Sequence, residues 1–380
     1  MISLGATCFI LFFPLRTHSE LFSARRFAQH PQFVKVDLRP YGFSNAKPWR
    51  KSPFRLSGID EGYHEVAFGG SNTLLAAIAY AENSEAPHTE QLKLVIIEPT
   101  SGQVMSTHSW EAVYYKLGLL GTPAGNIIVR VENELALYSS KLELLQKMPL
   151  QISRNRGTEY WKVLPSPSGE SVLLVHRVNG FLEFALIEPD TLRQKSSWKI
   201  PADVFSGIGS SFVPLEDGIL SVVKDRANGD CLVKVNNPDG SSTSVYRFPP
   251  PCYPEAQVLN NDTFYVRNGK EFLLIKRGGS VLLRQSMKKE EFPAAMRSST
   301  DGRRFAIAYA SMRGGNELLD TNSHQVLKRI QIYDVATLGT LFVLDDRSAK
   351  LQSVSDFGLS PDGSRLAILR DGFIEVYATP

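Results

Sequence analysis

Two histidines and several carboxylates lie in long polar segments, where these residue types could bind a metal ion. The histidines are His88 and His324, and each has Ser, Thr and acidic residues close by in the sequence. Imidazole and carboxylate groups are suitable ligands for zinc and related ions. The nearby carboxylates are Glu85, Glu90 and Asp320. A solvated loop is the simpler interpretation, because polar connections usually run over the surface. We predict no metal site beyond these two candidates.

Sequence motifs for catalysis are incomplete or absent. Gly358-Leu-Ser360-Pro-Asp362 begins like a nucleophile elbow, but Asp stands where the second glycine is needed. Gly207-Ile-Gly209 resembles a dinucleotide-binding loop but lacks the third glycine. The chain contains no C-x-x-C, H-E-x-x-H, Walker-type or EF-hand pattern. We therefore predict no catalytic residue and no cofactor.

The elements that would position any site come from a repeated unit, a hydrophobic strand that ends in an acidic or turn segment. The clearest copies are Leu94-Val-Ile-Ile-Glu98, Phe184-Ala-Leu-Ile-Glu188 and Ile330-Gln-Ile-Tyr-Asp334, and weaker copies begin at Leu135, Cys231, Phe272 and Phe373. The copies recur at intervals of 40 to 58 residues. A four-stranded propeller blade takes about 40–50 residues, so this spacing indicates a β-propeller.

A two-strand hairpin precedes these strands. Its turn reads Ser-Pro-Asp-Gly or a close variant, in which proline presets a type I turn and glycine accepts a left-handed conformation. Short apolar runs of the kind that form buried strands follow each turn. The turns are Thr122-Pro-Ala-Gly125, Ser166-Pro-Ser-Gly169, Ser299-Thr-Asp-Gly302 and Ser360-Pro-Asp-Gly363.

We predict an all-β fold, a seven-bladed β-propeller whose last blade is closed by an N-terminal strand. Seven anchor strands give seven blades, although six or eight stay open because some copies match weakly. The last copy stops after its third strand, and residues 52–59 resemble the fourth strand of other copies. We expect 52–59 to pair with 373–378, because a closed ring removes exposed strand edges.

The repeats resemble a known group of proteins. Ile330-Gln-Ile-Tyr-Asp-Val-Ala-Thr337 and Leu359-Ser-Pro-Asp-Gly-Ser-Arg-Leu-Ala-Ile368 look like repeats of bacterial YVTN, TolB-like and WD40-like propellers. The resemblance extends over nearly the whole chain from residue 52. It implies a ligand or protein partner on the face formed by blade-to-blade loops and by loops between second and third strands.

Two long insertions fall on that face and are the best place to expect binding. Each joins the second and third strands of a blade, in blades one and six, and insertions in a repeat often lie on the binding face. The polar residues predicted to contribute are Glu82, Glu85, His88, Arg313, Glu317, Asp320 and His324.

Charge and composition favour a globular surface. The 380 residues are 43% hydrophobic, and the formal net charge is +3 with both signs interspersed. Residues 47–55 combine basic and aromatic side chains, but one local cluster does not make a nucleic-acid platform. We predict a monomer that binds no nucleic acid.

The N-terminus differs in kind from the repeats. Residues 2–15 form a 14-residue apolar run, which is too short for a membrane span and suits a secretory signal. Phe22-Ser-Ala24 could be the cleavage site. We expect a signal peptide over 1–24, an extension over 25–51 and one propeller domain over 52–380. Export to the periplasm or outside the cell follows; a cytoplasmic protein is the alternative.

Removal of such a leader leaves two cysteines, Cys231 and Cys252. Both are expected on the same face of the propeller. They could form a disulfide in an oxidising compartment, and the alternative is two unpaired buried side chains.

The combined prediction is a non-enzymatic propeller that binds or scaffolds an unknown protein or small ligand. The alternative is a lactonase-like propeller enzyme with a polar site in the central channel. Such a site needs several inward carboxylates or histidines, and the carboxylates expected near first strands are Glu65, Glu255 and Asp356.

Overall fold

The computed structural model of the chain describes the segments that form the blades. These are residues 32–43, 64–81, 89–113, 117–131, 133–150, 162–202, 211–225, 227–250, 254–268, 271–286, 291–313, 324–345, 351 and 354–380. They form strands β1 to β28 and one short helical turn, Arg39–Tyr41. No helix in these segments has the length and apolar character needed to cross a membrane.

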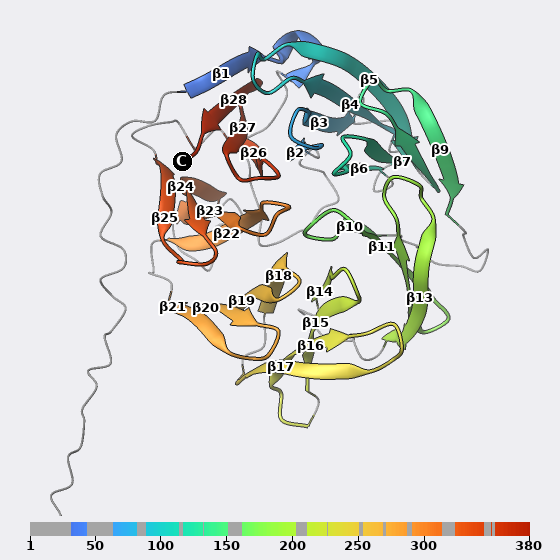
Figure 1. Cartoon of the computed structure of the whole chain (residues 1–380), viewed down its shortest axis with the longest axis vertical. Coiled ribbons are helices and arrows are strands. Elements are labelled where there is room, and N and C mark those ends of the chain that lie inside the picture. Colours follow the sequence, from blue (N-terminus) through green and yellow to red (C-terminus); the bar gives the residue numbers. More distant parts are fainter. Residues whose placement is uncertain are drawn as a thin grey trace, which may run out of the picture.

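The strands make seven four-stranded antiparallel sheets, arranged as blades around a ring (Figure 1). The predicted all-β, seven-bladed propeller is thereby confirmed. In blades 1 to 6 the strands follow one another along the chain from the centre of the ring to its rim, and in blade 7 β1 takes the outermost place. The anchor strands of the sequence are the third strands. Residues such as Ile, Val and Phe dominate these strands because they pack well on pleated, buried surfaces.

The strand bounds follow blade by blade. Blade 1 contains β2 (His64–Phe68), β3 (Leu74–Ala81), β4 (Thr89–Ile97) and β5 (Val104–Val113). Blade 2 contains β6 (Leu117–Gly121), β7 (Ile127–Val131), β8 (Glu134–Tyr138) and β9 (Leu144–Pro149). Blade 3 contains β10 (Lys162–Pro165), β11 (Val172–Val178), β12 (Phe181–Ile187) and β13 (Gln194–Pro201). Blade 4 contains β14 (Ser211–Pro214), β15 (Ile219–Lys224), β16 (Cys231–Asn236) and β17 (Ser242–Phe248).

The other three blades repeat this plan. Blade 5 contains β18 (Pro254–Asn260), β19 (Thr263–Asn268), β20 (Glu271–Lys276) and β21 (Val281–Ser286). Blade 6 contains β22 (Phe292–Ser298), β23 (Arg304–Arg313), β24 (His324–Asp334) and β25 (Thr340–Asp345). Blade 7 contains β26 (Val354–Leu359), β27 (Arg365–Arg370), β28 (Phe373–Ala378) and β1 (Gln32–Asp37).

An N-terminal strand completes blade 7, but it is not the predicted one. β1 pairs antiparallel with β28, so that Lys35 lies opposite Glu375 and Val36 opposite Ile374. The expected pairing of 52–59 with 373–378 is therefore wrong, and residues 52–59 lie outside the described segments. β1 fits because its valines alternate with polar residues, which places Val36 in the core and Lys35 at the surface. The other boundaries predicted for the N-terminal region stay predictions.

The core is divided among the contacts between blades. Each of seven hydrophobic clusters is shared by two adjacent blades, including the cluster between blades 7 and 1 that closes the ring. Central strands are buried on both faces because a neighbouring blade covers each face. For example, Phe305 and Tyr333 of blade 6 stack at 5.0 Å on the side that faces blade 5.

Candidate functional site

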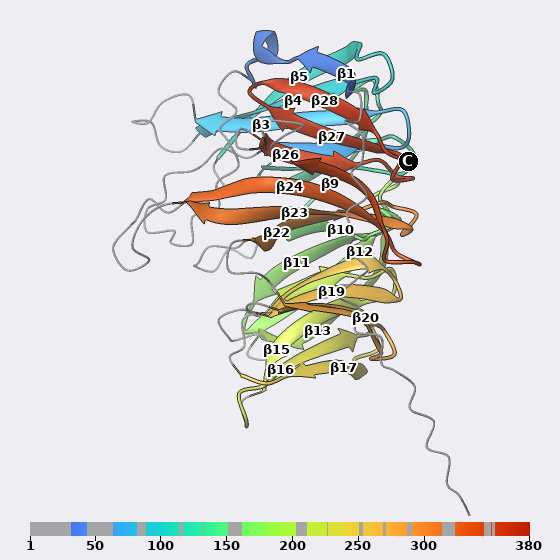
Figure 2. The ribbon, with the colours of Figure 1, turned by 90° about the vertical axis from the view of Figure 1, so that its left-hand side faces the viewer.

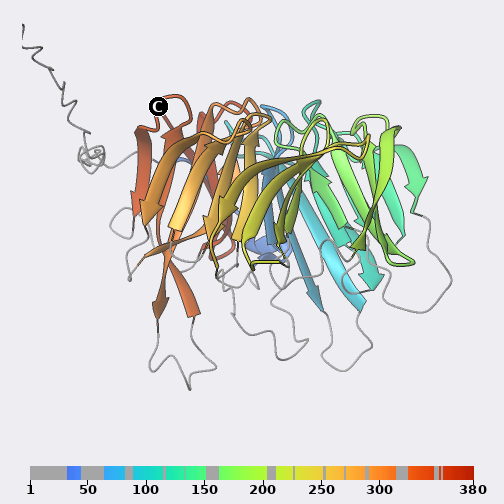
Figure 3. The same cartoon turned by 90° about the horizontal axis from the view of Figure 1, so that it is seen from below.

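The propeller has two faces with different connections. Connections between first and second strands, and between third and fourth strands, emerge on one face, which we call the turn face. Connections between second and third strands, and from blade to blade, emerge on the other, the loop face. Figure 3 shows both faces edge-on, with the tight turns on one side and the ends of the longest strands on the other.

The acidic residues that end the anchor strands cap turns on the turn face. The Glu98 carboxylate accepts hydrogen bonds from the backbone amides of Thr100 and Ser101, at 3.1 and 2.5 Å, and from the Thr100 hydroxyl. These bonds, led by the one from Ser101, lower the pKa of Glu98 from 4.5 to about 2. Asp334 accepts from the Thr337 amide at 2.7 Å in the same way. The acidic position of the repeat is therefore structural.

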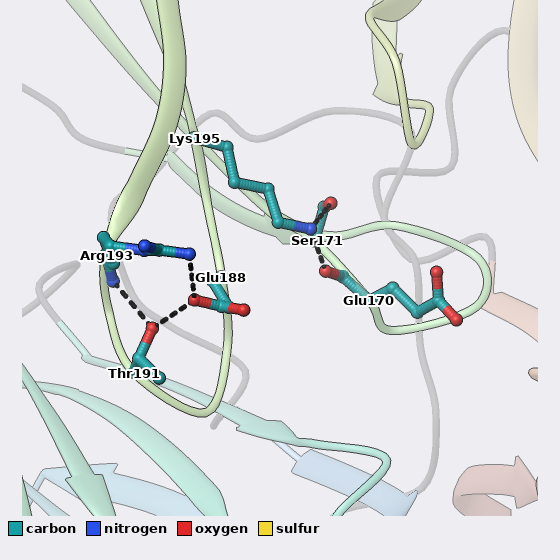
Figure 4. Close-up of polar contacts among 6 residues, drawn as sticks. All are labelled: Glu170, Ser171, Glu188, Thr191, Arg193 and Lys195. Carbon is teal, nitrogen blue, oxygen red and sulfur yellow. Dashed lines mark hydrogen bonds and ion pairs between the residues drawn. The ribbon is translucent and has the colours of Figure 1, made fainter.

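Blade 3 shows such a turn together with a second polar contact (Figure 4). Thr191 Oγ1 donates to Glu188 Oε2 at 2.6 Å, and Arg193 Nη2 lies 3.3 Å from the same oxygen. Lys195 Nζ donates to the carbonyl oxygen of Glu170 at 2.7 Å and reaches Ser171 Oγ at 3.0 Å. The Thr191 bond, with Arg193 nearby, lowers the pKa of Glu188. The bonds of Lys195 therefore connect the turn at Glu188–Arg193 with the turn that ends at Ser171.

The predicted hairpin turns are present, and Ser360 of the elbow-like motif is bonded within its own turn. Ser360 is 1% exposed; its Oγ donates to Asp362 Oδ1 at 2.7 Å and accepts from the Arg365 amide at 2.9 Å. Gly363 has φ of 69°, the left-handed conformation expected of this position. Burial alone would raise the pKa of Asp362, but hydrogen bonds from Ser364 and Ser360 lower it to about 2. The elbow-like motif at Ser360 is turn chemistry.

Contacts between neighbouring blades run along the turn face. Thr122 Oγ1 of blade 2 donates to Asp190 of blade 3 at 2.6 Å, and Ser168 Oγ of blade 3 donates to Glu216 of blade 4 at 2.6 Å. Further bonds join Glu216 N to Asn261 Oδ1, Asn260 Nδ2 to Gly302 O, Asp301 N to Pro361 O, and Arg365 Nη1 to Ser71 O. The polar groups of this face are thus largely bonded to one another.

The loop face carries the ends of two long ribbons. In blade 6, β23 and β24 stay paired to Arg313, which lies opposite His324. In blade 1, β3 and β4 stay paired to Ala81, which lies opposite Glu90. Figure 2 shows these ribbons reaching farther toward the loop face than the strands around them. The ribbon ends are therefore where the described chain approaches the predicted binding loops.

Most of the predicted binding residues lie outside the segments that the structure describes. Arg313 and His324 are placed on β23 and β24, in register with each other. The others, Glu82, Glu85, His88, Glu317 and Asp320, lie outside the described residues. The contribution of these seven residues to binding stays a prediction.

The metal hypothesis is likewise untested at its own residues, because His88 lies outside the described segments. Within those segments, no three His, Cys, Asp or Glu side chains come close enough together to hold a metal ion.

One of the two predicted disulfide cysteines is described. Cys231 is fully buried at the start of β16 and is disulfide-bonded. The other cysteines of the chain, Cys8 and Cys252, both lie outside the described residues. Pairing with Cys252 stays a prediction.

On the first strand of blade 7, the buried carboxylate of Asp356 links three blades. Asp356 of β26 accepts from the Val66 amide of blade 1 at 2.7 Å and pairs with Arg297 of blade 6 at 3.0 Å. Burial raises the pKa of Asp356, although Arg297 opposes that shift. Gly358 is required beside it, because a Cβ there would lie 2.6 Å from the Val66 carbonyl oxygen. Asp356 therefore fastens three blades together.

Sequence reasoning missed a set of apolar side chains on the rim. Met105, Leu145 and Leu282 are 44%, 52% and 38% exposed. Each is the extra residue of a β-bulge near the start of a fourth strand, and a bulge redirects a side chain. The signal in the sequence is a pair of consecutive apolar residues, such as Leu144-Leu145, where alternation would bury only one.

Comparisons with known proteins agree with the fold. No protein-family model matches the sequence, and no curated protein matches it. A chain from the crystal structure of the mitotic checkpoint complex, a WD40 propeller, is 13% identical with a TM-score of 0.50, and the match covers 98% of this chain and 99% of that one. BamB from Moraxella catarrhalis is 10% identical with a TM-score of 0.39, over 92% of this chain and 99% of that one. The predicted generic propeller resemblance is confirmed.

Proposed function

We propose that this chain is a non-enzymatic propeller that binds a protein partner through its loop face. Propellers hold many unrelated functions, so the fold alone does not decide between them. The WD40 propeller compared above is part of the mitotic checkpoint complex. Two features of the described residues support binding of a protein partner by the present chain.

The observation that carries the proposal is the length of the blade 6 ribbon. β23 and β24 have 10 and 11 residues, whereas the corresponding strands of blade 2 have 5 each. Each residue adds about 3.3 Å to a strand. Ala310 and Leu327 of this ribbon still pack in the core shared with blade 7, but the pairing continues beyond them to Arg313 and His324. Ordering that outer part costs entropy, which favours a role in presenting the connecting loop to a partner.

The second feature is that polar groups of the turn face are already hydrogen-bonded. Its turn-capping carboxylates and hairpin hydroxyls already have hydrogen-bond partners, within a blade or across two blades. A partner that bound there would have to break these bonds, at a net cost of about 1 kcal/mol each. Binding at the opposite face avoids that cost.

A ribbon deletion tests the proposal. The variant lacks residues Met312 to Asn322, and the control carries Asp239→Ala and Ser241→Ala in an exposed turn of blade 4 on the turn face. Proteins captured by the wild-type chain are identified, purified and titrated against all three forms. We expect the deletion to raise the Kd at least about tenfold, which corresponds to ~1.4 kcal/mol, while unfolding midpoints stay close to wild type.

The proposal fails if the deletion leaves Kd unchanged, or if only the turn-face control weakens binding. A deletion that unfolds the protein would instead assign the ribbon a structural role. In that case the single substitution Arg313→Glu, at the ribbon end, replaces the deletion in the titration.

We further propose that the protein is exported. The apolar run at the N-terminus and the disulfide at Cys231 support this, because disulfides persist in oxidising compartments. Cleavage after Ala24 would leave β1 intact, since that strand begins at Gln32. N-terminal sequencing of the mature protein should begin near Arg25. A mature chain that retains Met1 would contradict the proposal.

A further inference from the structure

One exposed hairpin on the loop face has an unusual chemical environment. Asn179 and Gly180 form the two-residue connection between β11 and β12 of blade 3, and Val178 pairs with Phe181 on either side of it. Both residues have positive φ, 47° and 83°, as a type I′ turn requires of an Asn-Gly pair. Both are exposed. The turn therefore presents a carboxamide and its neighbouring backbone nitrogen to solvent.

Nothing among the described residues restrains the two reacting groups of this turn. The carbonyl oxygen of Gly180 accepts a bond from the Ala202 amide at 2.7 Å. Within the described segments, however, neither the Gly180 nitrogen nor the Asn179 carboxamide makes a hydrogen bond. The position of a Cβ on Gly180 has no atom within 4 Å. The carboxamide carbon and the glycine nitrogen can therefore approach each other.

A second Asn-Gly pair on the same face provides the contrast. Asn228 and Gly229 lie in the connection between β15 and β16, and Asn228 is also exposed. Here the Gly229 amide donates to the Asp225 carbonyl at 2.8 Å. The Asn228 Oδ1 atom accepts from the Asp230 amide at 3.0 Å. Both reacting groups of this pair are held by hydrogen bonds.

We propose that Asn179 is a site of spontaneous deamidation in the folded protein and that Asn228 is protected. The deprotonated Gly180 nitrogen attacks Cγ of Asn179, and the bond from Cγ to Nδ2 breaks. Ammonia leaves, and the chain holds a cyclic imide. Water then opens either carbonyl of the imide, which yields aspartate or isoaspartate at position 179. Loss of the glycine proton starts the reaction, so its rate rises with pH.

The modification would change the loop face at a defined place. Both products add one negative charge, and the isoaspartate product also inserts a backbone carbon into a two-residue turn. Phe181, which is 44% exposed, follows directly. The proposal does not depend on partner binding, because it concerns the chemistry of the turn alone.

The test follows both sites in one sample. The intact protein is incubated at pH 6 and pH 9, digested, and analysed by mass spectrometry for conversion of the Asn179-Gly180 and Asn228-Gly229 peptides. A parallel sample is unfolded in urea with its disulfide reduced. In the folded protein at pH 9, we expect Asn179 to react roughly five- to tenfold faster than Asn228, the factor that one retained hydrogen bond supplies. In urea the two rates should become similar.

Each other outcome overturns the proposal. Equal rates in the folded protein would show that the hydrogen bonds at Asn228 give no protection. An unreactive Asn179 in the folded protein, combined with reaction in urea, would show that the turn blocks imide formation. The Asn179→Gln variant, whose longer side chain forms the imide slowly, should abolish the modified peptide and serves as the assignment control.

Discussion

The Asp356 carboxylate accepts a 2.7 Å hydrogen bond from the backbone amide of Val66, across a sequence separation of 290 residues. This bond joins the first strands of blades 7 and 1 beside the central channel. On the outer side of blade 7, the fully buried Glu375 lies 3.3 Å from Lys35 of β1 and accepts from Tyr377 at 2.8 Å. Two buried carboxylates therefore fasten the blade in which β1 pairs with β28.

Substitution of Asp356 should lower the free energy of unfolding. The loss should be larger when the new side chain has no oxygen to accept the hydrogen bond from the Val66 amide. Asp356→Ala leaves that amide buried without its acceptor, which costs about 2–3 kcal/mol. Asp356→Asn keeps an oxygen there and loses mainly the pair with Arg297, a partner that is 41% exposed, so it should cost about half as much. Urea unfolding measures both. Equal effects would show that the amide bond is unimportant.

Truncation tests the strand that closes the ring. A chain that begins at residue 31 keeps β1, whereas one that begins at residue 38 loses it. We expect the first to unfold like the full-length protein. The second should lose at least about 3 kcal/mol, because it loses buried Val36 and exposes the edge of β28. Thermal unfolding and light scattering provide the measurements. Equal stability would mean that another segment closes blade 7.

Two leucines adopt a left-handed backbone conformation, and replacing each with glycine compares the cost of backbone strain with the stabilisation from side-chain packing. Leu192 and Leu142 have φ of 50° and 64° in equivalent turns, but Leu192 is 3% exposed and Leu142 is half-buried. Glycine relieves strain of about 1–2 kcal/mol at both. The buried leucine contributes more than that through packing. Leu192→Gly should therefore destabilise by about 1–3 kcal/mol, and Leu142→Gly should be nearly neutral in urea unfolding.

The capped turn at Glu98 predicts a pH-dependent contribution to stability. Hydrogen bonds from Ser101 and Thr100 lower the pKa of Glu98 from 4.5 to about 2. The folded state thus favours the ionised carboxylate, so the stabilisation is complete above pH 4.5 and disappears as pH falls toward 2. Glu98→Gln should lower the urea midpoint at pH 7, with a difference from wild type that vanishes over that interval. A difference independent of pH would contradict the assignment.

The repeats predicted the ring because each copy carries its own turn chemistry and its own apolar strand. The closing strand was misplaced for a physical reason: an outer strand is buried on one side only, so its pattern is weak. Among Val34 to Asp37, whose burial the structure describes, Val36 alone belongs to the buried hydrophobics. Pairing with β28 depends on the register of the whole ring, which no local pattern contains.

The sites were harder to predict than the fold. A carboxylate such as that of Glu98 could serve in catalysis. Its hydrogen-bond partners are backbone amides two and three residues away, which identifies it as a turn cap. The role of Asp356 depends on Val66 and Arg297, which lie in other blades. The exposed apolar residues on the rim, such as Leu145, could have been predicted from the two consecutive apolar residues in the sequence, but aligning the repeats did not use this signal.

The proposed binding face is tested most directly by hydrogen exchange of the complex with its purified partner. If the loop face binds, protection should concentrate at the ends of β3, β4, β23 and β24 that lie toward the loop face, near Ala81 and Arg313. Exchange in the turns at Glu98–Gln103 and Glu188–Arg193 should stay as in the free protein. Protection confined to those turns, with the ribbon ends unchanged, would contradict the proposed function.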